Sequence, residues 1–255
     1  MNFRRKIKKD ANPFIIGVVL ILIAIFVYVI MIHGFAAGLL ECEWHEYVDV
    51  IYYINLDSRS DRKTEFLEEM KRMGVPSEKV CRITAVNKPG KGDWGCSLSH
   101  IIAMKTFIDS GLDTCIIFED DFIFNQNIEE INTAFKKVFD NKVIYDVIMI
   151  SANEIDVQPT DYDNLKKVKD AQTSSGYMVN KDFANTLYEN YKAGEALIEK
   201  SYESGKSMGI QGPFCVDTYW KSLQPNSNWY MFYPKLGVQR ESYSDIEGVV
   251  VDYKV

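Results

Sequence analysis

The chain has 255 residues, enough for a short anchor and one sizeable domain whose core needs no disulfide or metal to hold it together. Its formal net charge is −7, but the first twelve residues hold five basic side chains against one acidic one, so the remainder carries −11. This acidic remainder argues against nucleic acid as a partner. The five cysteines include no short-spaced pair, so they indicate neither a zinc site nor a disulfide framework.

An uncharged apolar run from residue 14 to residue 32 directly follows the basic cluster. As a helix it would span roughly 28 Å, close to the thickness of a bilayer's hydrocarbon core. Because the basic residues come first, the positive-inside rule predicts a cytosolic tail at 1–13, a transmembrane anchor at 14–32 and a type II orientation. A cleaved signal peptide is the alternative, since small residues follow at 36–38, but the length of the run favours a retained signal anchor. The one-sided basic flank disfavours a buried core helix.

Residues 33–47 are interpreted as a short stem, and residues 48–255 as a single domain. From about Val48 the chain alternates between strand-like and helix-like segments, which is typical of a layered α/β domain. We interpret the polar stretch 154–170 as a loop and 194–212 as flexible. The predicted strands cover 49–55, 81–86, 114–118, 145–151, 174–180 and 229–233, and the predicted helices about 60–73, 97–110, 128–138 and 183–191.

The strands near residues 50, 116 and 147 are each joined to the next through a helical segment. Such crossovers favour parallel pairing, and ligands of parallel sheets bind at the carboxyl ends of the strands. The segments Asn55-Leu56-Asp57 and Glu119-Asp120-Asp121 both fall at such ends. We therefore expect these two segments to form one site.

The triplet Glu119-Asp120-Asp121 directly follows a buried strand. Three neighbouring carboxylates repel one another unless a cation lies among them, and Mn²⁺ or Mg²⁺ prefers carboxylate and phosphate oxygens. On an extended backbone Glu119 and Asp121 point to one side and Asp120 to the other, which imitates a D-x-D metal motif. The alternative is a solvated turn or a helix N-terminus that happens to be acidic.

Other side chains are candidates for the same site. Arg59 and Arg62 precede a helix and suit phosphate recognition, although an exposed surface charge is the commoner role of any single arginine. His100 begins a helix that Ser97 or Ser99 would cap, where a cap or core histidine is the usual reading. Asp217 lies among apolar residues and is a candidate general base, a salt-bridge partner or a helix cap.

At these residues the chain resembles glycosyltransferase family 25, which includes lipooligosaccharide galactosyl- and glucosyltransferases and the collagen galactosyltransferases. The matching pieces occur in the family's order and cover nearly everything after the stem. They are INLDSRSDR at 54–62, AVN at 85–87, GCSLSH at 95–100, IIFEDDF at 116–122, SSGYMVNKDFANTL at 174–187, PFCVD at 213–217 and YPKLGVQRESYSDIEG at 233–248.

The resemblance implies a GT-A-like nucleotide-binding α/β sandwich with a mostly parallel central sheet, preceded by the anchor. It implies UDP-galactose or UDP-glucose as donor, Mn²⁺ or Mg²⁺ as metal, and a glycan, lipooligosaccharide or hydroxylated protein as acceptor. The resemblance also implies roles for individual residues of this chain. The nucleotide would be held by Asn55, Arg59 and Arg62, and the metal and diphosphate by Glu119, Asp120 and Asp121. The site would be lined by Ser99 and His100, with His100 counted as catalytic. Asp217 would be the base or a group that orients the acceptor.

The expected reaction is a single, inverting displacement in which a carboxylate deprotonates the acceptor hydroxyl and UDP leaves. The topology predicts a lumenal domain, in the Golgi or endoplasmic reticulum, or an otherwise non-cytosolic one. One alternative is an inactive relative that serves as a membrane-anchored binding or adhesion protein, against which the intact triplet and arginines argue. Another is a metal-dependent phosphoesterase or nuclease, which would gather more His and Asp ligands than this chain supplies.

Overall fold

The structure is a computed structural model that describes residues 17–18, 21–29, 42–205, 212–244 and 249–251. The chain divides into two compact units, 1–42 and 43–255, which are described separately. In the first unit, residues 21–29 are helical with exposed side chains. Among the described residues, no helix is both long enough and apolar enough to cross a bilayer. The rest of the predicted anchor, and the whole predicted tail at 1–13, lie outside the described residues.

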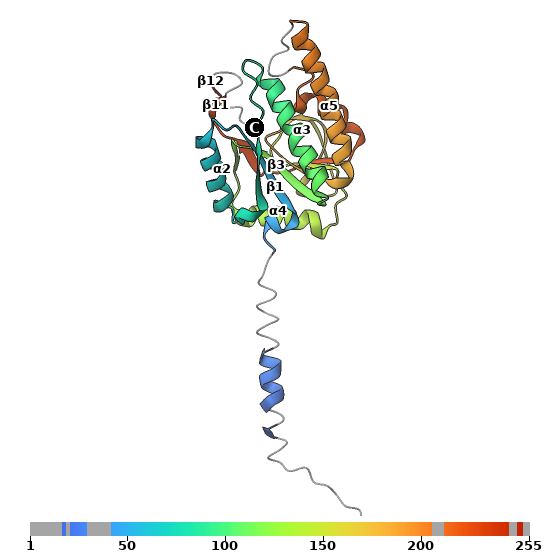
Figure 1. The fold of residues 1–255 in the computed structure, drawn as a ribbon. Coiled ribbons are helices and arrows are strands. Elements are labelled where there is room, and N and C mark those ends of the chain that lie inside the picture. Colours follow the sequence, from blue (N-terminus) through green and yellow to red (C-terminus); the bar gives the residue numbers. More distant parts are fainter. Residues whose placement is uncertain (1–16, 19–20, 30–41, 206–211, 245–248, 252–255) are drawn as a thin grey trace, which may run out of the picture. The chain divides into compact units, whose positions relative to one another are not determined.

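An eight-stranded sheet forms the centre of the second unit, and Figure 1 shows helices on either side of it. In spatial order its strands are β2 (Val80–Thr84), β1 (Val50–Asn55), β3 (Thr114–Glu119), β8 (Gly176–Asn180), β5 (Val147–Met149), β9 (Trp229–Phe232), β7 (Leu165–Gln172) and β6 (Asn153–Pro159). β1 pairs in parallel with β2 and β3, and β5 with β9. The other four pairings are antiparallel.

The prediction of a mostly parallel sheet is therefore corrected to a mixed sheet. β1, β3 and β5 share one direction, as their helical connections predicted, but β8 lies antiparallel between β3 and β5. Tyr177, Met178 and Val179 of β8 are fully buried, so this strand has an apolar partner on both faces. Its apolar sequence identifies a buried strand but not the direction in which the strand runs.

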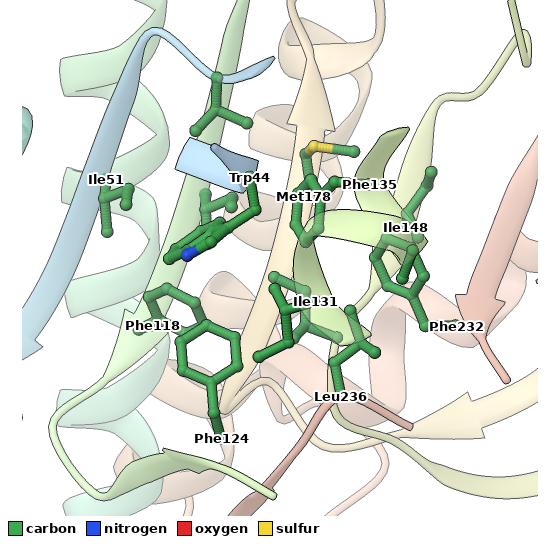
Figure 2. Close-up of a cluster of buried hydrophobic side chains, with 14 of the residues drawn as sticks. Trp44, Ile51, Phe118, Phe124, Ile131, Phe135, Ile148, Met178, Phe232 and Leu236 are labelled. Carbon is green, nitrogen blue, oxygen red and sulfur yellow. The ribbon is translucent and has the colours of Figure 1, made fainter. Parts of the chain in front are cut away.

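Alternate side chains of the strands face two separate cores, one on each face of the sheet. In β3, Phe118 packs in the core that contains side chains of α2 and α4, and Figure 2 shows it beside Trp44 and Phe124. Ile117 packs in the other core with α3 and α5, which run side by side in Figure 1. This arrangement confirms the predicted α/β class. The main helices are α2 (Ser60–Arg72), α3 (Gly92–Ser110), α4 (Ile128–Asp140) and α5 (Lys181–Glu203).

Short strands and helical turns complete the second unit. Two-stranded antiparallel sheets pair β10 (Gly237–Gln239) with β4 (Phe122–Phe124) and β11 (Ser242–Ser244) with β12 (Val249–Val251). The short helical turns are η1 (Trp44–Tyr47), η2 (Ser77–Lys79), α6 (Val216–Tyr219), η3 (Trp220–Ser222) and η4 (Gln224–Asn226).

The compact unit begins at Glu43, before the predicted domain start at Val48. Trp44 of η1 is fully buried in the core of Figure 2, and its indole Nε1 donates to the carbonyl oxygen of Met73 at 3.0 Å. Residues 44–47, assigned to the stem from the sequence, thus pack as part of the domain. A single buried indole has no periodicity, so the sequence pattern did not reveal it.

Trp44→Ala is expected to lower the free energy of unfolding by about 3–5 kcal/mol, because it empties a large core volume. Urea denaturation of the full chain measures this difference. Leu67→Ala is the matched control, since Leu67 of α2 is 38% exposed. Equal losses for both variants would show that the segment around Trp44 is not part of the core.

The predicted loop at 154–170 is instead the hairpin of β6 and β7, which pair antiparallel at the edge of the sheet. Most side chains of β6 are exposed, so this edge strand has a polar sequence that resembles a loop. In β7, only every third side chain is buried, which obscures the alternation expected of a strand.

Two helices are longer than predicted. α3 begins at Gly92, with Lys91 as its N-cap, so Ser97 and Ser99 lie inside the helix rather than capping it. α5 runs through most of the segment predicted to be flexible, to Glu203. Gly194 lies inside α5 because a Cβ there would approach the Phe214 carbonyl oxygen to 2.8 Å. This glycine is a close-packing feature rather than a helix breaker.

Candidate functional site

The carboxyl ends of β1 and β3 lie side by side, as the sequence predicted, because Ile54 pairs with Glu119 in the parallel register. A cavity of about 200 Å³ opens at this edge. Six of the nine predicted site residues line it: Arg62, Ser99, His100, Glu119, Asp120 and Asp121. In the described part of the chain, Asn55, Arg59 and Asp217 are not on the cavity wall.

Arg62 joins two members of the triplet. Its Nη1 donates to Asp120 Oδ1 and its Nη2 to Asp121 Oδ2, both at 2.9 Å, and its side chain is only 12% exposed. β3 ends at Glu119, and residues 120–121 form a turn. The expected alternation, with Asp120 facing away from Asp121, is therefore wrong, since both carboxylates face one guanidinium.

Asn55 is buried beneath the cavity and fixes Asp120 from the other side. Its Nδ2 donates to Asp120 Oδ2 at 2.6 Å and to the Arg59 carbonyl oxygen at 3.0 Å. Its Oδ1 accepts from Arg82 Nε at 3.0 Å. Arg82, which sequence reasoning missed, thereby sets the orientation of the Asn55 amide. Asp120 is thus fully engaged by neighbouring side chains.

The guanidinium of Arg59 has partners outside the triplet. Its Nη2 lies 2.9 Å from Asp61 Oδ2, and its Nη1 donates to the Tyr243 carbonyl oxygen at 3.2 Å. This pairing with Arg59 lowers the pKa of the Asp61 carboxyl to about 2. The two arginines that the sequence treated as equivalent therefore have different surroundings.

Glu119 accepts hydrogen bonds from side chains of α3 and of the segment that leads into β8. Its Oε1 accepts from Ser174 Oγ at 2.6 Å and lies 3.3 Å from Nε2 of the fully buried His100. His100 Nδ1 lies 2.9 Å from the Tyr177 hydroxyl, to which the Tyr191 hydroxyl donates at 3.2 Å. His100 is a core histidine and a site residue at once, which the sequence had treated as alternatives.

Ser99 links α3 to the neighbouring segment through hydrogen bonds. Its Oγ donates to the Gly95 carbonyl oxygen at 2.6 Å and accepts from the Val86 backbone N–H at 2.8 Å. A Cβ on Gly95 would come within 2.5 Å of the Val86 carbonyl oxygen. Gly95 and Ser99 together bring α3 against the 85–88 segment, which forms one wall of the cavity.

Asp217 holds a strained turn beside Ser174. Its Oδ2 accepts from the Thr173 backbone N–H at 3.2 Å, and Thr173 has a φ of 87°, which is rare for a β-branched residue. Burial raises the pKa of the Asp217 carboxyl, and the nearby Glu119 raises it further. The carboxylate is electrostatically close to Glu119 although it does not line the cavity.

The three carboxyl groups of the triplet differ in acidity. Burial raises the pKa of Asp120, and burial with the neighbouring Glu119 raises the pKa of Asp121 to about 6. Burial also opposes ionisation of Glu119, but the hydrogen bonds from His100 and Ser174 outweigh it and lower the pKa. Glu119 is therefore the stable anion of the three.

Whether a divalent metal fits the site depends on the carboxylate oxygens that accept no hydrogen bond. Asp121 Oδ1 is buried and accepts no hydrogen bond from any described residue, while Oδ2 accepts from Arg62 and from Gln239 Nε2 at 3.1 Å. Mg²⁺ and Mn²⁺ sites commonly use one or two carboxylates and complete the shell with water and substrate phosphates. Asp121 and Glu119 fit that requirement, whereas Asp120 is already engaged.

Sequence reasoning missed Ser174, Gln239, Cys96 and Tyr177, which come from four separate elements or loops. Only one of them carried a usable signal. Cys96 and His100 are four residues apart and share a helix face once α3 is known to begin at Gly92. The predicted helix start at Ser97 or Ser99 placed Cys96 outside the helix and hid this relation.

Solved structures that are distantly similar to the chain include the two that follow. No curated protein matches the chain. Among solved structures, A197 from STIV is similar at 11% identity over 76% of this chain and 94% of that chain, with a TM-score of 0.41. Mannose-1-phosphate geranyltransferase from Thermus thermophilus is similar at 7% identity over 77% of this chain and 76% of that chain, with a TM-score of 0.43.

The family comparison covers the centre of the domain. Residues 79–200 match the family model described as "Glycosyltransferase family 25 (LPS biosynthesis protein)". The matched segment contains Ser99, His100 and the acidic triplet, together with Ser174. This match supports the resemblance to glycosyltransferase family 25 over residues 79–200.

Proposed function

We propose that the chain is a glycosyltransferase that moves galactose or glucose from a UDP-sugar to a hydroxyl group of a glycan, lipooligosaccharide or hydroxylated protein acceptor. The observation that carries the proposal is Asp121 Oδ1, a buried oxygen that no described residue satisfies, on a cavity wall shared with Glu119 and Arg62. A buried anionic oxygen of this kind favours a cation. A divalent ion bound to a diphosphate is the cation that a nucleotide-sugar donor would bring.

The proposed metal is Mn²⁺ or Mg²⁺, held by Asp121 with Glu119. When bound, it would supply Lewis-acid stabilisation of the diphosphate leaving group, commonly worth several kcal/mol. Arg62 and Gln239 donate to Asp121 Oδ2, which leaves Oδ1 without a hydrogen bond from any described residue. Asn55 holds Asp120, so that this carboxylate supports Arg62 and does not compete for the ion.

The proposed reaction is an inverting displacement. The acceptor oxygen forms a bond to C1 of the sugar as the bond from C1 to the UDP oxygen breaks, and a carboxylate takes the acceptor's proton. Asp217 is the candidate base. Its raised pKa and its electrostatic proximity to Glu119 and His100 support this role, and the strained Thr173 turn that it holds lies next to Ser174.

Asp217→Asn tests that role. The Asn side-chain oxygen still accepts from Thr173, so the turn is retained, but the amide cannot take a proton. We expect kcat to fall by roughly 10²–10⁴ and the acidic limb of the pH–rate profile to disappear, because the wild-type base becomes protonated as the pH falls. Circular dichroism checks the fold. A variant with the wild-type rate and an unchanged acidic limb would leave Asp217 with only its hydrogen bond to Thr173.

A donor screen tests the function as a whole. The purified full chain is incubated with UDP-galactose, UDP-glucose and UDP-N-acetylglucosamine, with Mn²⁺, Mg²⁺ or a chelator, and UDP release is measured. We expect release from one of the two hexose donors that depends on the divalent ion. No UDP release under any condition would favour the inactive binding-protein alternative over a transferase.

The membrane anchor at 14–32 and a lumenal or otherwise non-cytosolic domain belong to this proposal. They rest on the sequence alone, on the basic cluster that precedes an uncharged apolar run. The described residues contribute no membrane-spanning helix in its support.

A further inference from the structure

A thiol, an imidazole and a carboxylate meet on the wall of the cavity. Cys96 and His100 lie one turn apart on α3, and Glu119 ends β3 opposite them. One ligand atom from each of the three lies within 4.8 Å of the other two. Among the residues that the structure describes, no other three His, Cys, Asp or Glu side chains bring their ligand atoms this close together.

The three side chains share the wall of one cavity, which provides an entry path. Tetrahedral Zn²⁺ with bonds near 2.0–2.3 Å separates its ligand atoms by ~3.3–3.8 Å, so a small contraction of the cluster suffices. His100 Nε2 faces Glu119, while its Nδ1 lies 2.9 Å from the Tyr177 hydroxyl. A ligating histidine commonly has such a partner on its second nitrogen.

The chemistry of this group differs from that of the triplet. Thiolate and imidazole are soft and borderline ligands that select zinc, whereas Mn²⁺ and Mg²⁺ prefer the carboxylate oxygens of Asp121 and Glu119. We infer that Cys96, His100 and Glu119 form a second cation site, which takes Zn²⁺ or a similar soft divalent ion. On binding, the Cys96 thiol releases its proton to solvent and its sulfur bonds to the metal.

Glu119 belongs to both sites, so a metal bound at one site affects metal binding at the other. A carboxylate drawn to zinc beside Cys96 and His100 is less available to a metal held by Asp121. Zn²⁺ therefore antagonises Mn²⁺ and inhibits sugar transfer. This consequence rests on the proposed function, whereas the binding of a soft metal does not.

Co²⁺ tests the site directly, because it replaces Zn²⁺ and gives a charge-transfer absorption band when bound by a thiolate. The metal-free full chain is titrated with CoCl₂, in the wild type, Cys96→Ser and Cys96→Ala. Cys81→Ser is the matched control, since Cys81 of β2 is exposed and not on the cavity wall. We expect the band in the wild type and in Cys81→Ser, its loss in both Cys96 variants, and Zn²⁺ affinity at least about 100-fold weaker in Cys96→Ser.

The experiment distinguishes a missing metal site from a misfolded variant. Thermal melts confirm that the Cys96 variants fold, and two different replacements guard against failure of one of them. A wild type without the band at saturating Co²⁺, or a band that persists in the Cys96 variants, would overturn the site. In a second arm, Zn²⁺ inhibition is expressed relative to each variant's own zinc-free rate and should weaken at least about tenfold in Cys96→Ser. If no transfer is detected at all, the proposed function fails while the Co²⁺ result still decides the metal site.

Discussion

Asp121→Asn is expected to abolish metal-dependent sugar transfer while leaving the domain folded. The amide has nearly the same shape as the carboxylate and can still accept from Arg62, but it carries no charge with which to hold a divalent ion. Lewis-acid stabilisation of several kcal/mol corresponds to a loss of roughly 10²–10³ in kcat/KM. Release of UDP from the donor measures it. Asp109→Asn is the control, since Asp109 pairs with Lys105 on the exposed face of α3.

Asp121→Asn is also expected to change how the free energy of unfolding depends on pH. The pKa of Asp121 is raised to about 6 in the folded chain, above its ordinary value, so the folded state binds this proton more tightly than the unfolded state does. Without metal, the resulting stabilisation is present at low pH and is lost as the pH rises through about 6. Its size is on the order of 2–3 kcal/mol. Urea denaturation between pH 4 and pH 8 should show this dependence weakened in Asp121→Asn, and identical pH profiles would contradict it.

Arg62→Ala is expected to destabilise the domain strongly. Arg62 lies 2.9 Å from both Asp120 and Asp121, and its removal leaves two buried carboxylates without a compensating charge. Breaking a buried ion pair from one side typically costs about 3–5 kcal/mol. Urea denaturation at pH 7.5 measures the loss. Because protonation neutralises the two carboxylates, the deficit should shrink as the pH is lowered toward 5.

Arg59→Ala is the matched control for that experiment. Arg59 lies one helical turn before Arg62, but its partner Asp61 has a side chain that is 59% exposed. Solvent-exposed pairs contribute about 0–1 kcal/mol, so the control should lose little. Equal losses in Arg59→Ala and Arg62→Ala would contradict the assignment of Arg62 as the counter-ion of the triplet.

Local patterns predicted the part of the site built on neighbouring strand ends. Asn55 and Glu119 end strands whose apolar sequences and helical connections indicate parallel pairing, and the structure places them side by side. The triplet's own arrangement was not predictable in the same way. Whether Asp120 faces away from Asp121 depends on where β3 ends, and Arg62 reaches both carboxylates from a different element.

Longer-range features were beyond the sequence. Ser174 and Tyr177 reach Glu119 and His100 only because β8 runs antiparallel to β3, a direction that no local pattern encodes. The start of α3 has a similar consequence. The predicted start at Ser97 or Ser99 left out the first residues of this helix, so the face shared by Cys96 and His100 became apparent only with the helix start at Gly92.

The metal at Asp121 is the central claim, and Mn²⁺ binding tests it most directly. The full chain is titrated with MnCl₂ in the presence of UDP, and free Mn²⁺ is followed by its electron paramagnetic resonance signal. Wild type and Cys81→Ser should remove Mn²⁺ from solution at concentrations where Asp121→Asn does not. Equal uptake of Mn²⁺ by wild type and Asp121→Asn would contradict the account.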